Sequence, residues 1–346
     1  MTEPVEIPEP TVSTAELQAA LEQALSNHFG APRTIIELER QPSWTRSSFA
    51  LEELTLHLDG DTNLQLMFKD LSLDSLLDSA RRAKPTFLYD PLREIKTYQS
   101  ILTPHQLGAA TYYGAVVNEE MGRYWLFIEK VPGLELYYVG LDTWQEVARW
   151  LAAMHARFVR EAASLLSMAP LLIYDGDFYK LWLHRAREFS QRSGPEQADE
   201  VRRGLEWLSG RYDRVVERLV SLPVTFIHGE FYASNVLVQE TEAGLRVCPI
   251  DWEMAAVGPG LLDLAALVAG SWTEEEKTTL ALAYQDALAP GGAWQPQPEA
   301  FLAALDHCRL HVAVQWLGWS ADWTPPPEHA QNWLHEALYL AEKLGL

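Results

Sequence analysis

The sequence predicts an α+β fold with two lobes, a small antiparallel-sheet lobe in residues 1–130 and a mainly helical lobe in residues 131–346. Three observations support this prediction. Apolar residues alternate on both sides of Asp59-Gly60-Asp61, which is typical of a β-hairpin. Beyond Pro132 the alternation gives way to long amphipathic segments with a helical period. The 346 residues also exceed one minimal domain and suit two lobes that share a cleft.

The first lobe is expected to begin with a disordered stretch, because residues 1–10 are acidic and rich in proline. Ser13 or Thr14 is suited to cap a helix that stops at Gly30, and a second helix is predicted at 91–102. Mostly alternating apolar residues predict strands at 34–39, 49–58, 64–69, 111–117 and 124–129.

The second lobe is predicted to be helical with a β-hairpin embedded in it. A connector near residues 129–134 leads into this lobe. Amphipathic patterns predict helices at 144–158, 178–190, 198–219 and 274–288. Between them, short apolar runs predict strands at 224–227, 235–239 and 245–250.

Charge and composition exclude several classes of protein. The formal net charge of −21 argues against nucleic acid or an anionic membrane as partner, because both need a basic surface. Cys248 and Cys308 form neither a disulfide framework nor a metal-ligand spacing. Asp263 interrupts the longest apolar run, and the N-terminus lacks the features of a signal peptide. We therefore expect a soluble, cytoplasmic monomer or homodimer.

Polar residues collect at the ends of the strands predicted for the embedded hairpin. The stretch FIHGEFYASNVLVQ, residues 226–239, places Asn235 five residues after Glu230, and VCPIDWE places Asp251 sixteen residues after Asn235. Such oxygen donors suit Mg²⁺, which is held by few protein ligands together with substrate phosphates. This spacing is that of a kinase catalytic loop followed by a metal-binding aspartate. The alternative is that these are turn-forming polar residues at strand ends.

The same stretch resembles the aminoglycoside phosphotransferase and choline kinase superfamily. The family signature H-G-D-x-x-x-x-N…I-D-W-E is matched by His228, Gly229, Glu230, Asn235, Ile250, Asp251, Trp252 and Glu253. The segment GPGLLDLA, residues 258–265, resembles the continuation of this motif and contains Asp263. The resemblance extends over residues 34–320 and implies a protein-kinase-like fold. It also implies transfer of the γ-phosphate of ATP or GTP, with Mg²⁺, to a hydroxyl of an aminoglycoside-like compound or another amine or sugar metabolite.

The resemblance assigns roles to the matching residues. Asn235 and Asp251 would bind the cation, while His228 and Asp263 would support the catalytic loop. Glu230 would handle the proton of the acceptor hydroxyl, but the family usually has aspartate at this position. The extra methylene moves the carboxylate by about one bond length, and catalysis is sensitive to shifts of ~1 Å. The alternative is therefore a nucleotide-binding pseudokinase that acts as a scaffold or sensor.

Two charged residues of the first lobe are candidates for nucleotide binding. Lys69 ends the third predicted strand, as the phosphate-contacting lysine of kinases does. Glu94 lies on the following predicted helix, from which it can pair with Lys69. Without the second-lobe motif, both would be interpreted as solvated surface charges.

The remaining nucleotide contacts are predicted from loops. The loop between the first two strands lacks G-x-G-x-x-G but contains Ser47 and Ser48, whose hydroxyls can bind phosphate; such a loop is equally well a plain turn. By the resemblance, backbone groups from Glu129 to Val131 would meet the nucleobase.

Histidines and aromatic residues elsewhere have simpler interpretations. His155 is expected to be a hydrogen-bonded core residue, and His307 and His311 to be ordinary helix residues in the absence of a third ligand motif. Several aromatic side chains are expected in the core, with an acceptor site as the alternative: Tyr174, Phe178, Tyr179, Trp182, Trp316 and Trp319.

Overall fold

The computed structural model describes residues 12–43, 48–49, 51–190, 195–288, 294–319 and 330–346. It divides into two compact units. The first consists of Met1–Arg82 and Asp90–Pro132, and the second of Ala83–Tyr89 and Gly133–Leu346. The first contains an antiparallel sheet and the second is mainly helical, which confirms the predicted α+β class.

The first unit is built on a five-stranded antiparallel sheet with the order β1-β2-β3-β5-β4. Its strands are β1 (Ile35–Pro42), β2 (Leu51–Leu58), β3 (Thr62–Asp70), β4 (Tyr112–Asn118) and β5 (Arg123–Glu129). Its helices are α1 (Thr14–Phe29), α2 (Asp78–Ala83), α3 (Pro91–Thr97) and α4 (Thr103–His105). The predicted hairpin is confirmed, since Leu58 on β2 is paired with Thr62 on β3.

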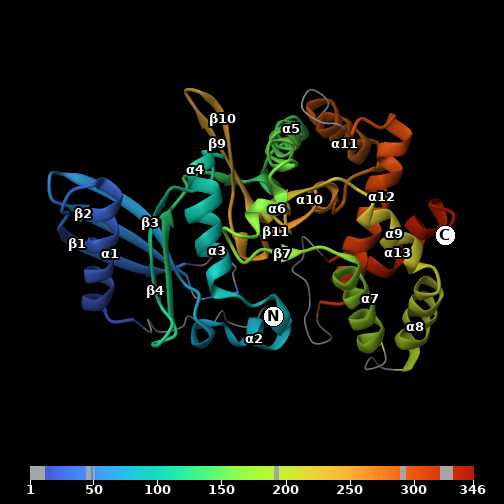
Figure 1. Cartoon of the computed structure of the whole chain (residues 1–346), viewed down its shortest axis with the longest axis horizontal. Helices are drawn as coiled ribbons and strands as arrows, with labels where there is room; N and C mark the ends of the chain where they lie inside the picture. The colour runs from blue at the N-terminus through green and yellow to red at the C-terminus, as the bar shows by residue number, and fades with distance from the viewer. Residues whose placement is uncertain (1–11, 44–47, 50, 191–194, 289–293, 320–329) are drawn as a thin grey trace. The chain divides into compact units, whose positions relative to one another are not determined.

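Helix α1 covers one face of this sheet (Figure 1). Its N-cap is Ser13, whose hydroxyl accepts a hydrogen bond from the Glu16 backbone N–H. Leu17 and Leu21 of α1 pack in one buried cluster with Phe68 of β3. Because side chains alternate along a strand, Lys69 points to the opposite face.

The second unit contains nine α-helices and six strands in its described residues, apart from the end of α2. The helices are α5 (Leu141–Phe158), α6 (Ala162–Leu165), α7 (Gly176–Ser190), α8 (Pro195–Ser209), α9 (Tyr212–Val220), α10 (Leu261–Leu267), α11 (Glu274–Leu288), α12 (Pro298–Leu317) and α13 (Trp333–Lys343). The strands are β6 (Leu134–Glu135), β7 (Leu172–Ile173), β8 (Val224–Ile227), β9 (Val236–Thr241), β10 (Gly244–Pro249) and β11 (Ala256–Pro259).

One predicted helix of this unit is two helices. The segment predicted at 198–219 is interrupted between α8 and α9 at Gly210 and Arg211, where Arg211 leaves helical geometry. Glycine is a poor residue for a helix interior because it loses more backbone entropy than any other residue. The amphipathic pattern continues across the interruption and therefore does not reveal it.

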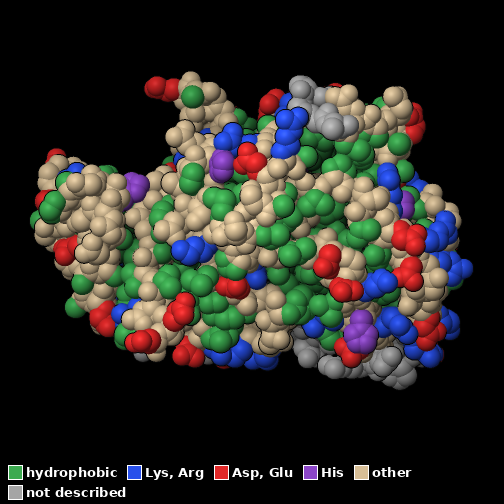
Figure 2. Space-filling view, in the orientation of Figure 1, with side chains coloured by type: hydrophobic (Ala, Val, Ile, Leu, Met, Phe, Trp, Pro, Cys, Tyr) green, Lys and Arg blue, Asp and Glu red, His purple; other side chains and the backbone are tan. Residues whose placement is uncertain are grey.

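The predicted hairpin β9–β10 is confirmed and is joined by β6 in a three-stranded sheet. Strand β11 lies between β7 and β8 in a second small sheet. Helices α7, α8, α9, α12 and α13 gather at one end of the unit (Figure 1). In the face drawn in Figure 2, acidic and basic side chains are intermingled over these helices. Among the described helices, none combines the length and the apolar character needed to cross a membrane.

Candidate active site

The end of the β9–β10 hairpin brings Asn235 and Asp251 together. Val236, the first residue of β9, is paired with Pro249, the last residue of β10. The Ile250 N–H then donates a hydrogen bond of 2.9 Å to the Asn235 carbonyl oxygen. The two residues, sixteen apart in sequence, therefore flank one end of one hairpin.

Asp251 has an unusual backbone conformation, with φ 62° and ψ 63°. This left-handed region is costly for residues other than glycine, by about 1–2 kcal/mol, and persists where surrounding contacts enforce it. The next residues form a tight helical turn, Trp252–Met254. The Trp252 indole is buried and donates a hydrogen bond of 3.0 Å to the Pro249 carbonyl oxygen. The turn thus holds Asp251 where an unconstrained chain would not place it.

The loop that carries Glu230 is fixed through its backbone. The Asp263 carboxylate accepts hydrogen bonds from the N–H groups of His228, at 2.7 Å, and Gly229, at 2.9 Å. His228 Nε2 is 2.8 Å from the Ile250 carbonyl oxygen, which connects this loop to the residue before Asp251. Gly229 has φ 87°, and a Cβ there would lie 2.3 Å from the Met254 carbonyl oxygen. Only glycine fits this approach between the two loops.

A buried histidine and tyrosine lie behind Asp263. His155 Nε2 is 3.2 Å from the Asp263 carboxylate, and its Nδ1 is 2.7 Å from the Tyr284 hydroxyl. Burial raises the pKa of Tyr284, so its hydroxyl stays neutral. His155 is the hydrogen-bonded core residue expected from the sequence, but its bond to Asp263 spans 108 positions and has no local signal.

The side-chain oxygen atoms of Asn235 and Asp251 are suited to bind a magnesium ion. The Asn235 amide nitrogen donates a hydrogen bond of 3.0 Å to the Glu230 carbonyl oxygen, which leaves the Asn235 Oδ1 for another partner. Glu230 itself is only partly buried. Among the described residues, no three His, Cys, Asp or Glu side chains cluster as a metal site. One amide oxygen and one carboxylate fit Mg²⁺, which usually completes its shell with water and nucleotide phosphates.

In the first unit, Lys69 and Glu94 form a buried ion pair. Lys69 Nζ lies 2.7 Å from a Glu94 carboxylate oxygen, and the two residues are 4% and 1% exposed. Helix α3 presents Glu94 because Asp90 caps its first turn and Pro91 occupies its first position. A lysine so deeply buried requires an acidic partner, which the sequence predicted to be Glu94.

The loop candidates divide into described and undescribed residues. Ser47 lies outside the described residues, whereas the Ser48 carbonyl oxygen accepts a hydrogen bond from Leu77. The Glu129 N–H is already bonded to the Thr111 carbonyl oxygen at 2.8 Å. Val131 makes no backbone hydrogen bond to any described residue, so its polar groups remain available to a ligand.

Aromatic side chains lie beside the loop that carries Glu230. Tyr232, two residues after Glu230, contacts Trp316 with ring centroids 5.4 Å apart, and Trp316 stacks on Trp333. Burial, and then the nearby Glu230 charge, raise the pKa of Tyr232. Trp316 is only partly buried.

The other sequence candidates lie in the core, along α12 or just after its end. Trp319 is partly buried and stacks on Trp182. His307 bonds the Ala303 carbonyl oxygen, and His311 bonds the Tyr212 hydroxyl. Four of the aromatic candidates are buried: Tyr174, Phe178, Tyr179 and Trp182.

Part of the chain matches the model of a known protein family. The model of a family described as "Phosphotransferase enzyme family" matches residues 80–302, more than half of the chain. No curated protein sequence matches the chain.

Three solved structures illustrate the likeness in fold. A microcompartment-associated aminopropanol kinase is 16% identical, with a TM-score of 0.59 over 94% of this chain and 96% of that one. The wild-type aminoglycoside 2'-phosphotransferase-IIIa in its GDP complex is 15% identical, with a TM-score of 0.53 over 94% and 97%. The ethanolamine kinase of Plasmodium vivax is 13% identical, with a TM-score of 0.52 over 89% and 82%. The predicted fold class and superfamily resemblance are confirmed.

Proposed function

The chain belongs to the phosphotransferase enzyme family, and from this premise we propose that it transfers the γ-phosphate of ATP or GTP to a hydroxyl group of a small molecule. Family membership confirms the enzyme class predicted from the sequence, a phosphotransferase. The nucleotide, the magnesium ion and the acceptor are the parts of the proposal that rest on individual residues.

The observation that carries the proposal is the construction of the hairpin end. Asn235 and Asp251 flank it with oxygen donors, and Asp263 fixes the loop of Glu230 beside it through two backbone hydrogen bonds. Phosphoryl transfer depends on positioned groups and charge stabilisation more than on covalent chemistry by the protein. A rigid loop with a partly exposed carboxylate supplies this kind of positioning.

Each residue has a specific task in this proposal. Asn235 Oδ1 and the Asp251 carboxylate would hold Mg²⁺, which would neutralise charge on the transferred phosphoryl group. Glu230 accepts a hydrogen bond from the acceptor hydroxyl and orients it for attack. Lys69, held by Glu94, contacts the nucleotide phosphates.

Further nucleotide contacts in this proposal come from loops. Ser47 and Ser48 contact phosphate, and the backbone of Glu129 to Val131 meets the nucleobase. The open backbone groups of Val131 support this assignment, whereas the Glu129 N–H is already occupied by Thr111.

For the acceptor, we propose an amine or sugar metabolite. Tyr232 lies two residues beyond Glu230, and the partly exposed Trp316 packs against it. Aromatic faces attract ammonium groups and stack on sugar rings. The acidic composition of the chain is compatible with a cationic acceptor.

A screen of nucleotide consumption tests the proposal. ATP and GTP are each incubated with Mg²⁺, the protein and aminoglycosides, choline-like amines, sugars or macrolides. We expect at least one acceptor to increase consumption. The alternative, a pseudokinase, is motivated by glutamate at position 230, and it expects the nucleotide to bind without any acceptor increasing consumption.

A further inference from the structure

The segment Ala83–Tyr89 lies between two parts of the first unit in sequence but folds with the second unit. Its Lys84 forms an ion pair with Glu253, 169 positions away, and the two side chains are only 6% and 10% exposed. Glu253 belongs to the turn that follows Asp251. A lysine outside every sequence motif thus pairs with the turn that follows Asp251.

The segment is held in place at both ends. Pro85, with φ −60°, restricts Lys84 to extended conformations, and Leu88 is buried. The Phe87 ring is 5.6 Å from the ring of Trp182 on α7, and the Arg185 guanidinium lies 5.7 Å above it. These contacts fix the direction from which Lys84 approaches Glu253.

The ion pair with Lys84 restrains the turn, because the Glu253 carboxylate cannot move without moving the residues on either side of it. Glu253 lies between Trp252 and Met254, both fully buried. The Met254 carbonyl oxygen in turn closes against Gly229 of the catalytic loop. A buried carboxylate needs a charged partner, so losing Lys84 would make the present position of Glu253 unfavourable. Movement of Glu253 would then release Asp251 from its left-handed conformation.

We propose that Lys84 is a positioning residue for the cation site, acting through Glu253 on Asp251. This inference rests on the proposed function, in which Asp251 is a metal ligand. Lys84 holds Glu253 away from the cation, and Glu253 holds the turn that presents the Asp251 carboxylate. The site therefore has two protein ligands, with a neutralised carboxylate behind them.

Mn²⁺ binding to the full chain tests this inference without an acceptor. Free Mn²⁺ is measured by electron paramagnetic resonance during titration in the presence of ADP. Outer residues that orient metal ligands typically contribute 10–100-fold to affinity, so we expect Lys84→Met to raise the Mn²⁺ dissociation constant roughly tenfold or more. Lys84→Arg, which keeps the charge, should retain most of the affinity. Combining Lys84→Met with Glu253→Gln should be no worse than Lys84→Met alone.

Lys343→Met is the matched control. Lys343 lies on α13, and its Nζ is 2.8 Å from the carboxylate of the buried Asp306 on α12. The Lys343→Met variant should be less stable to urea than the wild type but bind Mn²⁺ with the same affinity. Mn²⁺ binding to Lys84→Met is measured under conditions in which urea unfolding shows this variant to be folded. Equal Mn²⁺ affinity of Lys84→Met and the wild type, or tighter binding by the variant, would overturn the inference alone. The proposed function would be overturned as well if the wild type bound no Mn²⁺, or if Asp251→Ala bound Mn²⁺ as the wild type does.

Discussion

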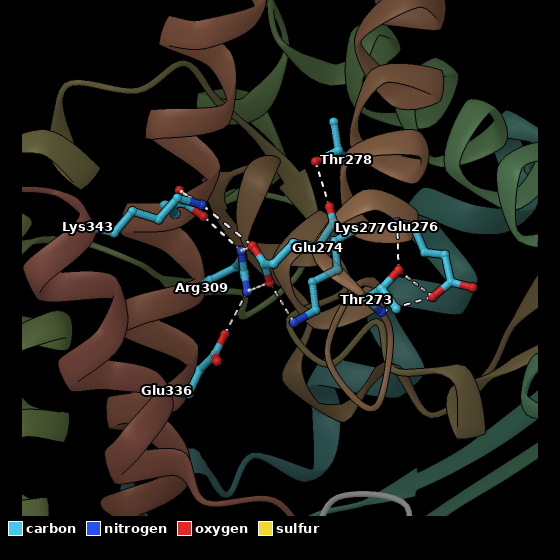
Figure 3. A network of polar contacts seen from close by, with 9 residues as sticks. Thr273, Glu274, Glu276, Lys277, Thr278, Arg309, Glu336 and Lys343 are labelled. Atoms are coloured by element: carbon cyan, nitrogen blue, oxygen red, sulfur yellow. Dashed lines mark hydrogen bonds and ion pairs between the residues drawn. The ribbon is translucent and has the colours of Figure 1, made fainter.

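The second unit contains two groups of charged and polar side chains that differ in how many of their polar atoms are hydrogen-bonded or ion-paired. One surrounds the hairpin end at Asn235 and Asp251. The other joins α11, α12 and α13 (Figure 3). There the Arg309 guanidinium bonds Glu274 at 2.9 Å, Asp306 at 2.8 Å and Glu336 at 2.7 Å.

The network in Figure 3 is closed, because Glu274, Asp306 and Glu336 each bond Arg309, whereas the Asn235 Oδ1 at the hairpin end accepts no hydrogen bond from a described residue. Lys277 and Lys343 add further bonds to the acids of the network. Burial alone would raise the pKa of Glu274, but Arg309 and then Lys277 lower it to about 2. At the hairpin end, no residue in the described part of the chain bonds the Asn235 Oδ1, and the Asp251 backbone lies in the left-handed region. Backbone strain and one oxygen without a partner among the described residues thus distinguish the candidate site from the network, rather than the number of charges.

The first prediction concerns Asp251 at the hairpin end, where a substitution should have the largest effect on nucleotide turnover. Asp251→Ala removes a proposed cation ligand, so Mg²⁺-dependent nucleotide turnover should fall by roughly 10⁴-fold, equivalent to the several kcal/mol that a catalytic metal supplies. Urea unfolding shows whether the variant is folded, and turnover is compared per folded molecule. Normal turnover by this variant would mean that the cation site is assigned to the wrong residue.

Glu230 tests the proton-handling half of the hairpin end. Glu230→Gln should keep nucleotide binding and lower transfer to a known acceptor by roughly the 10²–10⁴-fold of a positioned general base. Glu230→Asp keeps a carboxylate set back by one methylene and should retain part of the activity. The measurement is the initial rate of transfer for the three proteins. Equal rates for the wild type and Glu230→Gln would show that another group or water handles the proton.

Substitution of Arg309, in the closed network, is expected to lower stability and leave transfer unchanged, whereas Asp251→Ala is expected to lower turnover. Arg309→Met removes the buried cation that joins Glu274, Asp306 and Glu336, of which Asp306 is buried, so the free energy of unfolding should fall by about 3 kcal/mol. Transfer per folded molecule should be unchanged. Urea unfolding measured beside the transfer rate checks both. A stable variant with impaired transfer would contradict the division between the two groups.

His311 provides the smallest effect, a pH dependence. Burial lowers its pKa from 6.5 to about 3, and Tyr212 bonds its Nδ1. Between these two values the unfolded chain binds a proton that the folded chain excludes, so stability falls as the pH falls below 6.5. From pH 6.5 to pH 5 this amounts to about 2 kcal/mol.

Urea unfolding at several pH values, with His311→Gln as comparison, checks this expectation. Glutamine cannot take up the proton, so the variant should lose this part of the pH dependence whatever its stability at pH 7. The same slope in both proteins would show that other groups cause it.

Local spacing predicted much of the fold and of the candidate site. The turn at Gly60 and the alternation around it predicted the hairpin of β2 and β3. The sixteen positions between Asn235 and Asp251 fit two short strands and the turn between them. The spacing therefore predicted that the two residues flank the open end of one hairpin. The pairing of Lys69 with Glu94 followed from the order of strand and helix.

Contacts between distant segments left no such signal. Lys84 and Glu253 are 169 positions apart, and His155 is 108 positions from Asp263. Each pair depends on how packed elements meet, which no periodicity encodes. Strand β7 has two residues, too few to show an alternation.

The most direct test of the central claim, that the hairpin end serves phosphoryl transfer to a small molecule, is phosphorus-31 nuclear magnetic resonance of the complete reaction. ATP or GTP, Mg²⁺, the protein and each acceptor of the panel are followed in time. We expect one acceptor to yield a phosphomonoester signal equal in amount to the nucleoside diphosphate formed, and Asp251→Ala to abolish both signals. Nucleotides that stay intact with every acceptor, or that release only inorganic phosphate, would contradict the account.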